Sequence, residues 1–103
     1  MHARVTLLEI DTVRISVDET LKLYEADVVP RLREQPGFRG VYGLATPEGK
    51  ALVMTFWDTS EQAETVENTF YTGLLEQFMT LFRAPPGRES YEVRLAMPPR
   101  EPD

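Results

Sequence analysis

Hydrophobic and polar positions follow two different periods along the chain, and their order predicts the secondary structure. Stretches that alternate, or that are apolar throughout, predict strands at 4–11, 38–46, 51–57 and 90–96. A period close to 3.6 predicts helical regions within 17–35 and 59–83. In 4–11 and 51–57 apolar residues occupy both parities, which is typical of strands covered on both faces. The predicted element order is therefore β-α-β-β-α-β.

Short polar motifs mark where the helices begin and end. Ser16 with Glu19 three residues later forms a capping box for the first helical region. For the second region two capping pairs fit the sequence, Asp58 with Glu61 and Thr59 with Gln62. Pro30 lacks a backbone N–H and predicts a kink in the first region, which the Pro-Gly pair at 36–37 ends. Gly73 predicts a bend in the second region.

This order predicts an α+β fold of the ferredoxin-like kind, with a four-stranded antiparallel sheet and both helices on one face. The first strand presents Val5 and Leu7 on one face and Leu8 and Ile10 on the other. Helices on one face alone would leave an apolar patch in water, which monomers rarely tolerate. We therefore expect a homodimer in which two sheet faces pack together into an α+β barrel.

Composition narrows the classes of partner. The 103 residues suffice for one domain, expected over 1–97, with a flexible Pro-rich tail at 98–103. The net charge of -6, from 17 acidic and 11 basic residues, disfavours nucleic-acid binding. No apolar run approaches the roughly 20 residues that span a bilayer, so no membrane association is expected.

The residue types available for chemistry exclude several kinds of site. Cysteine is absent, which excludes disulfides and thiolate metal sites. The single histidine, His2, stands at the chain end, which argues against a histidine metal site and against a buried Ser–His pair. We therefore expect no metal. The first residues carry no secretory signal, and with the absence of cysteine this fits a cytoplasmic location.

Several motifs together resemble one known family. They are Gln-Pro-Gly-Phe at 35–38, the hairpin turn at 47–50, Phe-Trp-Asp at 56–58, Ser-Glu-Gln-Ala at 60–63 and the short final strand. Over 5–96 the chain resembles the antibiotic-biosynthesis-monooxygenase (ABM) domain of the dimeric α+β-barrel superfamily. That family includes cofactor-independent oxygenases of polycyclic phenols and quinols, haem-degrading oxygenases, and many relatives without known activity. The resemblance implies a ligand pocket between the sheet and the helices, near Trp57.

The chain departs from both catalytic patterns of that family. Haem-degrading relatives use an Asn on the first strand and a His on the helix after the Trp, and neither stands here in 4–11 or 65–70. Haem degradation and a haem cofactor are therefore not expected. In the polyketide-oxidising branch, the resemblance implies an Asn shortly before the Trp and a Tyr shortly after it. This chain has Val53 and Ala63 at those positions. The resemblance thus implies no cofactor and leaves the catalytic residues unknown.

The candidate substrate-binding residues are Trp57, Phe70, Tyr71, Phe78, Tyr24 and Asn68. Trp57 suits stacking on a flat aromatic ligand, and packing between strand and helix is the plainer alternative. The same alternative applies to the aromatic residues of 70–82. Asn68 suits either a ligand carbonyl or a helix-end cap. Glu9 and Arg94 are candidates for a cross-strand pair, or for a polar ligand site within the barrel.

Three functions are compatible with these features. The resemblance implies a small cofactor-independent monooxygenase of hydrophobic aromatic, quinol- or polyketide-like substrates, in which the deprotonated substrate reduces dioxygen inside an apolar pocket. The alternatives are a non-catalytic ligand-binding or pathway-accessory dimer of the same fold, and a polyketide cyclase-like enzyme. The sequence offers no obvious general base near neutral pH, since its one histidine is terminal.

Overall fold

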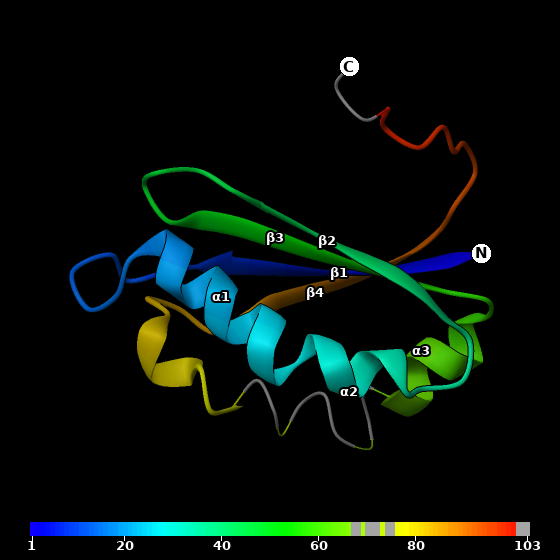
Figure 1. The fold of residues 1–103 in the computed structure, drawn as a ribbon, viewed down its shortest axis with the longest axis horizontal. Helices are drawn as coiled ribbons and strands as arrows, with labels where there is room; N and C mark the ends of the chain where they lie inside the picture. The colour runs from blue at the N-terminus through cyan, green and yellow to red at the C-terminus, as the bar shows by residue number, and fades with distance from the viewer. Residues whose placement is uncertain (67–68, 70–72, 74–75, 101–103) are drawn as a thin grey trace.

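A four-stranded antiparallel sheet forms one layer of the molecule, and the helices form a second layer along one side of it (Figure 1). The computed structural model describes residues 1–66, 69, 73 and 76–100. In chain order the elements are β1 (His2–Glu9), α1 (Val17–Asp27), α2 (Val29–Arg33), β2 (Phe38–Ala45), β3 (Lys50–Trp57), α3 (Ser60–Val66), the 3-10 turn η2 (Met79–Leu81) and β4 (Gly87–Glu92). This arrangement confirms the predicted α+β, ferredoxin-like architecture.

The strand order β2-β3-β1-β4 places β1 and β3 in the middle of the sheet. β1 pairs with β3 from His2 opposite Trp57 to Glu9 opposite Lys50, and it pairs with β4 from His2 opposite Glu92. Residues directly opposite one another share a face, and alternate residues along a strand face opposite sides. β1 and β3 both carry apolar residues on each face, such as Leu8 and Val53 toward the helices and Leu7 and Leu52 on the other side.

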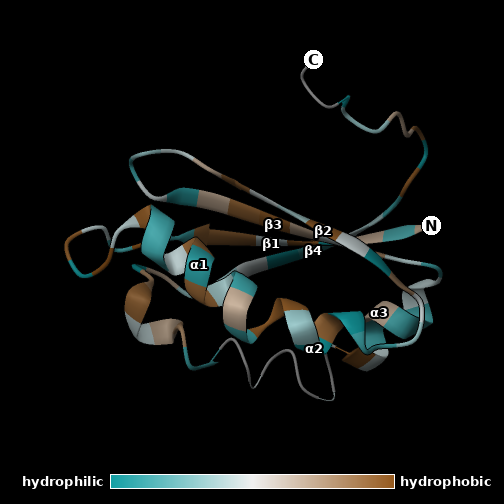
Figure 2. Ribbon diagram, viewed as in Figure 1, coloured by the Kyte–Doolittle hydropathy of each residue, from teal (hydrophilic) through white to brown (hydrophobic). Residues whose placement is uncertain are grey.

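The hydrophobic core lies between the sheet and the helices. Its largest fully buried side chains are Trp57, Ile10, Leu32, Val28 and Val53. Burying a side chain of this size stabilises the fold by about 1.5–3 kcal/mol. Figure 2 shows the hydrophobic residues on β1 and β3 and along the helices that face them. The core thus joins the two central strands to the first helical region.

An N-cap at Ser16 and a reciprocal capping box at Thr59 set the starts of α1 and α3. Ser16 Oγ accepts a hydrogen bond of 3.0 Å from the backbone N–H of Glu19, as the sequence predicted. At the start of α3, Thr59 Oγ1 accepts from Gln62 N and Gln62 Oε1 accepts from Thr59 N, both at 3.2 Å. Of the two pairs that fitted the sequence, the pair that begins at Thr59 is therefore the one that forms. A cap of this kind contributes roughly 0.5–2 kcal/mol.

Pro30 divides the first helical region into two helices. α1 ends at Asp27, and α2 begins at Val29 with Pro30 in its first turn, where the missing N–H needs no intrahelical partner. The chain then reaches β2 through Gly37, whose φ of 81° is a left-handed conformation that favours glycine. Gly37 O accepts a 2.9 Å hydrogen bond from Asp58 N, so the start of β2 is joined to the start of α3.

The last strand lies earlier in the chain than the sequence predicted. β4 spans Gly87–Glu92 rather than 90–96, because it pairs with β1 and β1 begins at His2. The 2.9 Å hydrogen bond from Val93 N to Met1 O closes this pairing. The alternating residues beyond this point have no strand to pair with, so β4 ends.

The suggested contact between Glu9 and Arg94 is wrong. Glu9 lies at one end of β1, opposite Lys50 of β3. Arg94 follows the end of β4, beside the start of β1 and thus at the other end of the sheet. Leu95 is 94% exposed, so the alternating residues around Arg94 do not pack on the sheet. The antiparallel register, rather than the local pattern, separates the two charges.

The second helical region ends sooner than its periodicity predicted. The pattern extends to Arg83, but in the described residues the last helical turn is η2, and Phe82 forms an isolated β-bridge with Ile10. Arg83 N then donates a 2.8 Å hydrogen bond to Glu9 O. This segment is therefore extended where it pairs with the end of β1. Here tertiary pairing overrides the helix propensity of the local sequence.

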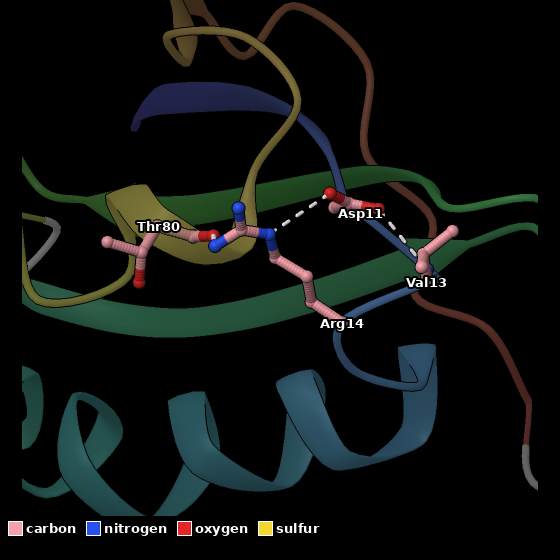
Figure 3. A network of polar contacts seen from close by, with 4 residues as sticks. All are labelled: Asp11, Val13, Arg14 and Thr80. Atoms are coloured by element: carbon pink, nitrogen blue, oxygen red, sulfur yellow. Dashed lines mark hydrogen bonds and ion pairs between the residues drawn. The ribbon is translucent and has the colours of Figure 1, made fainter.

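A small polar network ties the loop after β1 to η2 (Figure 3). Asp11 Oδ1 accepts a 3.2 Å hydrogen bond from Val13 N, and Asp11 Oδ2 lies 3.4 Å from Arg14 Nε. Arg14 Nη1 in turn donates to Thr80 O at 3.4 Å. Exposed pairs of this kind contribute little energy. They accompany the 2.8 Å backbone hydrogen bond from Asp11 N to Leu81 O, which joins the loop to η2.

Candidate functional site

Trp57 lies on the helix-facing side of the sheet, at the end of β3. Its side chain is 1% exposed, and its ring meets Phe38 edge-on, with centroids 5.3 Å apart and planes at 71°. Trp57 Nε1 donates a 3.0 Å hydrogen bond to Thr55 Oγ1, so the buried indole N–H is satisfied. Trp57 is therefore an inner wall of the domain, which fits both the ligand and the packing interpretation of the sequence.

Polar side chains gather beside Trp57 on the same side of the sheet. In the register of β1 and β3, His2 lies opposite Trp57 and Arg4 lies opposite Thr55. We call the polar strip the residues on the helix-facing side of β1 and β4, which are His2, Arg4, Thr6, Arg88, Ser90 and Glu92. Thr6 is 5% exposed, whereas every residue of β4 is exposed. The strip thus runs from the interior to the sheet edge.

Within the polar strip, His2 Nε2 and Ser90 Oγ form a hydrogen bond. Sequence reasoning placed His2 at an uninformative chain end, and it argued against a buried Ser–His pair. The structure shows a solvent-exposed pair instead, because β1 begins at His2 and its first residues pair with β4. No local motif could reveal a contact between residues 88 positions apart. The available signal was polar residues at alternate positions of both 2–6 and 88–92.

The remaining candidates from the sequence lie in different places. Phe78 is 5% exposed and belongs to the same core cluster as Trp57. Tyr24 is 8% exposed in that cluster, and it also lines a groove of about 330 Å³ between the first helices and β2, with Val41 and Val53. Trp57 does not line this groove. Three candidates lie outside the described residues, namely Phe70, Tyr71 and Asn68.

On the other side of the sheet, no helix of the described residues packs against the strands (Figure 1). We call the open face the apolar residues on this side, which are Ala3, Val5, Leu7, Tyr42, Leu44, Leu52, Met54, Phe56 and Tyr91. Leu44 is 52% exposed, Tyr91 50% and Tyr42 49%. The prediction that the two central strands carry apolar residues on both faces is confirmed. Helices cover only one of these two faces.

Within residues 1–66, 69, 73 and 76–100, no group of three or more His, Asp or Glu side chains is placed to hold a metal ion. In that same part of the chain, none of the helices has both the length and the apolar character that crossing a membrane requires.

Comparison with known proteins places the fold. Neither the models of known protein families nor the curated proteins yield a match to the chain. Solved structures match along nearly its whole length. A monooxygenase from the ActVA-Orf6 gene of Streptomyces coelicolor, solved with the ligand Nanaomycin D, is 21% identical, with a TM-score of 0.75 over 96% of this chain and 92% of that one. SnoaB, a cofactor-independent oxygenase from Streptomyces nogalater, is 11% identical, with a TM-score of 0.75 over 95% and 97%.

A Nitrosomonas europaea protein, named as a candidate antibiotic biosynthesis monooxygenase, is 13% identical, with a TM-score of 0.73 over 92% of this chain and 100% of that one. The chain has the fold of the antibiotic biosynthesis monooxygenases. This finding confirms the resemblance that the sequence motifs indicated. At these identities the likeness concerns the fold, so function has to be argued from the residues of the candidate site itself.

Proposed function

We propose that this chain is a small cofactor-independent monooxygenase of hydrophobic, electron-rich aromatic substrates of the quinol or polyketide kind. The observation that carries the proposal is the polar strip beside Trp57, on the helix-facing side of a fold shared with two oxygenases. A pocket for a flat aromatic molecule combines apolar walls with a few placed polar groups. This side of the sheet supplies both.

The proposed chemistry uses the substrate as the reductant. For an anthrone, a base removes one proton from the CH₂ carbon, the anion passes an electron to dioxygen, and the two radicals combine into a peroxide. The peroxide O–O bond then breaks as the second C–H proton leaves, and water departs. The balanced reaction is R₂CH₂ + O₂ → R₂C=O + H₂O. The protein has to bind the substrate, stabilise its anion and exclude bulk water.

Named residues suit these tasks. Arg4, in register with Thr55, brings a fixed positive charge that stabilises the substrate anion. Thr55 accepts from Trp57 Nε1 and keeps its own hydroxyl hydrogen to donate to a substrate oxygen. Trp57 and Phe78 supply apolar surface. The proposed substrate-binding set is completed by Tyr24, Phe70, Tyr71 and Asn68.

We propose in addition that the open face binds a second copy of the chain. Its exposed members are Leu7, Tyr42, Leu44 and Tyr91, and Tyr42 packs edge-on against Phe56, with centroids 6.0 Å apart. Polar residues border this patch, with Glu9 opposite Lys50 at one end and Glu89 on the edge strand. A patch with a polar rim is typical of an interface, and a two-fold dimer pairs it with itself.

Oxygen uptake with an anthrone tests the proposed function. The wild type is expected to consume one dioxygen per anthrone, faster than the uncatalysed autoxidation. Arg4→Gln should lower the rate by about 100-fold, because it removes a charge that stabilises the anion. Arg39→Gln is the matched control, since Arg39 forms an exposed ion pair with Asp58 at 3.1 Å, outside the polar strip, and its rate should stay at the wild-type value.

Uptake no faster than autoxidation would contradict the oxygenase proposal. Quenching of the single tryptophan by the same anthrone, without turnover, would then favour the ligand-binding alternative. Conversion of a polyketide-like substrate without oxygen consumption would favour the cyclase-like alternative.

A further inference from the structure

The chain has one histidine, and the structure places it in the polar strip. His2 lies opposite Trp57 in the register, two residues from Arg4, and its Nε2 is hydrogen-bonded to Ser90 Oγ. Imidazole is the side chain whose ordinary protonation change falls near neutral pH. The proposed reaction begins with the removal of a proton, which requires a base at this side of the sheet.

We infer that His2 is the general base of this site and that Ser90 is its positioning residue. This inference rests on the proposed oxygenase function. In the tautomer that donates Nε2–H to Ser90 Oγ, the lone pair of the ring lies on Nδ1. Nδ1 is therefore the atom that takes the substrate proton. The hydrogen bond to Ser90 Oγ positions the ring, in the way that an orienting group positions a catalytic imidazole.

The proton step balances within the site. The substrate O–H or C–H bond breaks, an N–H bond forms at Nδ1, and an imidazolium lies beside the substrate anion. Nε2–H stays donated to Ser90 Oγ throughout. After the peroxide forms, the imidazolium returns its proton to the peroxide oxygen that leaves as water, and His2 is neutral again. Dioxygen is the oxidant, and the substrate carbon is oxidised.

Charged groups face the pair from each element that packs against it. They are Arg4 on β1 and Glu92 and Arg88 on β4, whereas α3, which contacts β1, carries the exposed residues Glu61 and Glu64. Glu92 lies directly opposite His2 in the pairing of β1 with β4, so the two side chains project from the same face of the sheet. His2 is partly exposed, which allows its proton to exchange with water between turnovers. The surroundings of the pair thus suit an imidazole ring that carries a positive charge for part of each turnover.

Variants of the pair separate a catalytic role from a plain cross-strand hydrogen bond. Anthrone-dependent oxygen uptake is measured from pH 5 to 9 for His2→Ala, Ser90→Ala and Ser90→Thr. His2→Ala should lose about 100-fold or more in rate, together with the acid limb of the profile, and added imidazole should restore part of the rate. Ser90→Ala should lose about 10-fold, and Ser90→Thr, which keeps a hydroxyl, should lose less. Glu48→Gln in the exposed hairpin is the control and should match the wild type.

A second measurement does not depend on turnover. Because the chain has one histidine, its imidazole C–H signals in an NMR spectrum belong to His2 alone. Addition of 1-naphthol, a phenol that mimics the substrate, should move these signals over the same concentrations that quench the fluorescence of Trp57. Ser90→Ala should change the size of the movement.

The outcomes distinguish this inference from the proposed function. A wild type without oxygen uptake overturns the oxygenase function, and the base role falls with it. An active wild type whose His2→Ala variant keeps both its rate and its acid limb overturns the base role alone. Imidazole signals that stay still while naphthol quenches Trp57 also overturn it. Loss of the acid limb with imidazole rescue, in a folded variant, supports it.

Discussion

The two sides of the sheet are built from the same strands, yet their chemistry is the reverse of the usual pattern. A sheet covered on one side normally carries apolar residues under its cover and polar residues toward water. Over residues 2–7 of β1 the opposite holds, because His2, Arg4 and Thr6 face the helices while Val5 and Leu7 face away. The helix-facing side therefore carries the polar strip, and the open face carries apolar side chains that no helix of the described residues covers.

Each side departs from the usual pattern for a different physical reason. Polar groups beside the apolar wall of Trp57 are the combination that a small-molecule site needs, and we propose this role for them. Apolar groups such as Leu44, 52% exposed on the open face, indicate a partner surface. If the two sides have these separate roles, substitutions on one side should leave the other side unaffected.

The largest expected effect comes from the helix-facing side. Trp57→Ala should destabilise the fold by about 3–5 kcal/mol, because it empties the space of the largest fully buried side chain. Urea denaturation at fixed protein concentration measures this change. Tyr42→Ala, on the open face and 49% exposed, should cost clearly less. Equal losses in the two variants would break the distinction between a packed side and an uncovered one.

On the open face, a buried charge should act on association rather than on folding. Leu52 lies opposite both Leu7 and Leu44, at the middle of the patch. Leu52→Glu should weaken the dimer at least 100-fold, or about 2.7 kcal/mol, as measured by sedimentation equilibrium. Val13→Glu is the matched control, since Val13 is 88% exposed outside the sheet. A dimer that tolerates Leu52→Glu would show that the interface lies elsewhere.

Replacing a glycine that has a left-handed backbone conformation should disturb the helix-facing side and leave the open face intact. At Gly37, with φ of 81°, a Cβ would also overlap the side chain of Gln62, which caps α3. Gly37→Ala should therefore cost about 1–2 kcal/mol, measured by thermal or urea denaturation. Gly43→Ala is the control, because a Cβ there makes only an ordinary 3.7 Å contact with Leu21. Similar costs for both variants would argue against the strained turn.

The smallest effect is expected at the surface ion pair between Arg39 and Asp58. Their side chains are 60% and 50% exposed, and an exposed pair contributes roughly 0.2–1 kcal/mol. Arg39→Ala should change the urea midpoint slightly, less so at high salt, and leave oxygen uptake unchanged. A loss of oxygenase activity in this variant would place the site nearer to Arg39 than the polar strip does.

Local signals made most of the fold predictable from the sequence. The caps at Ser16 and Thr59 depend on residues three positions apart; the N-cap bond forms at Ser16 and the full reciprocal box forms at Thr59. Pro30 and Gly37 act through their own backbone, so the division and end of the first helical region were also readable. The parity of Val5 and Leu8 indicated the two-sided character of β1, because side chains alternate along a strand.

The candidate site was less predictable, because it depends on pairing between the two ends of the chain. His2 and Ser90 meet only through the register of β1 with β4, which local alternation does not specify. The same register explains why the pairing of Glu9 with Arg94 was wrong. Trp57 was found from the sequence, since a single tryptophan at a strand end stands out. Its bond to Thr55 depends on the orientation of the indole ring, which no local motif specifies.

The mass of the wild-type protein in dilute solution tests the contrast between the two sides most directly. We propose that the open face binds a second copy of the chain, so multi-angle light scattering at micromolar concentration should give about twice the 11.8 kDa of one chain. A mass of 11.8 kDa that stays constant as the concentration rises would contradict the assignment of the open face as an interface.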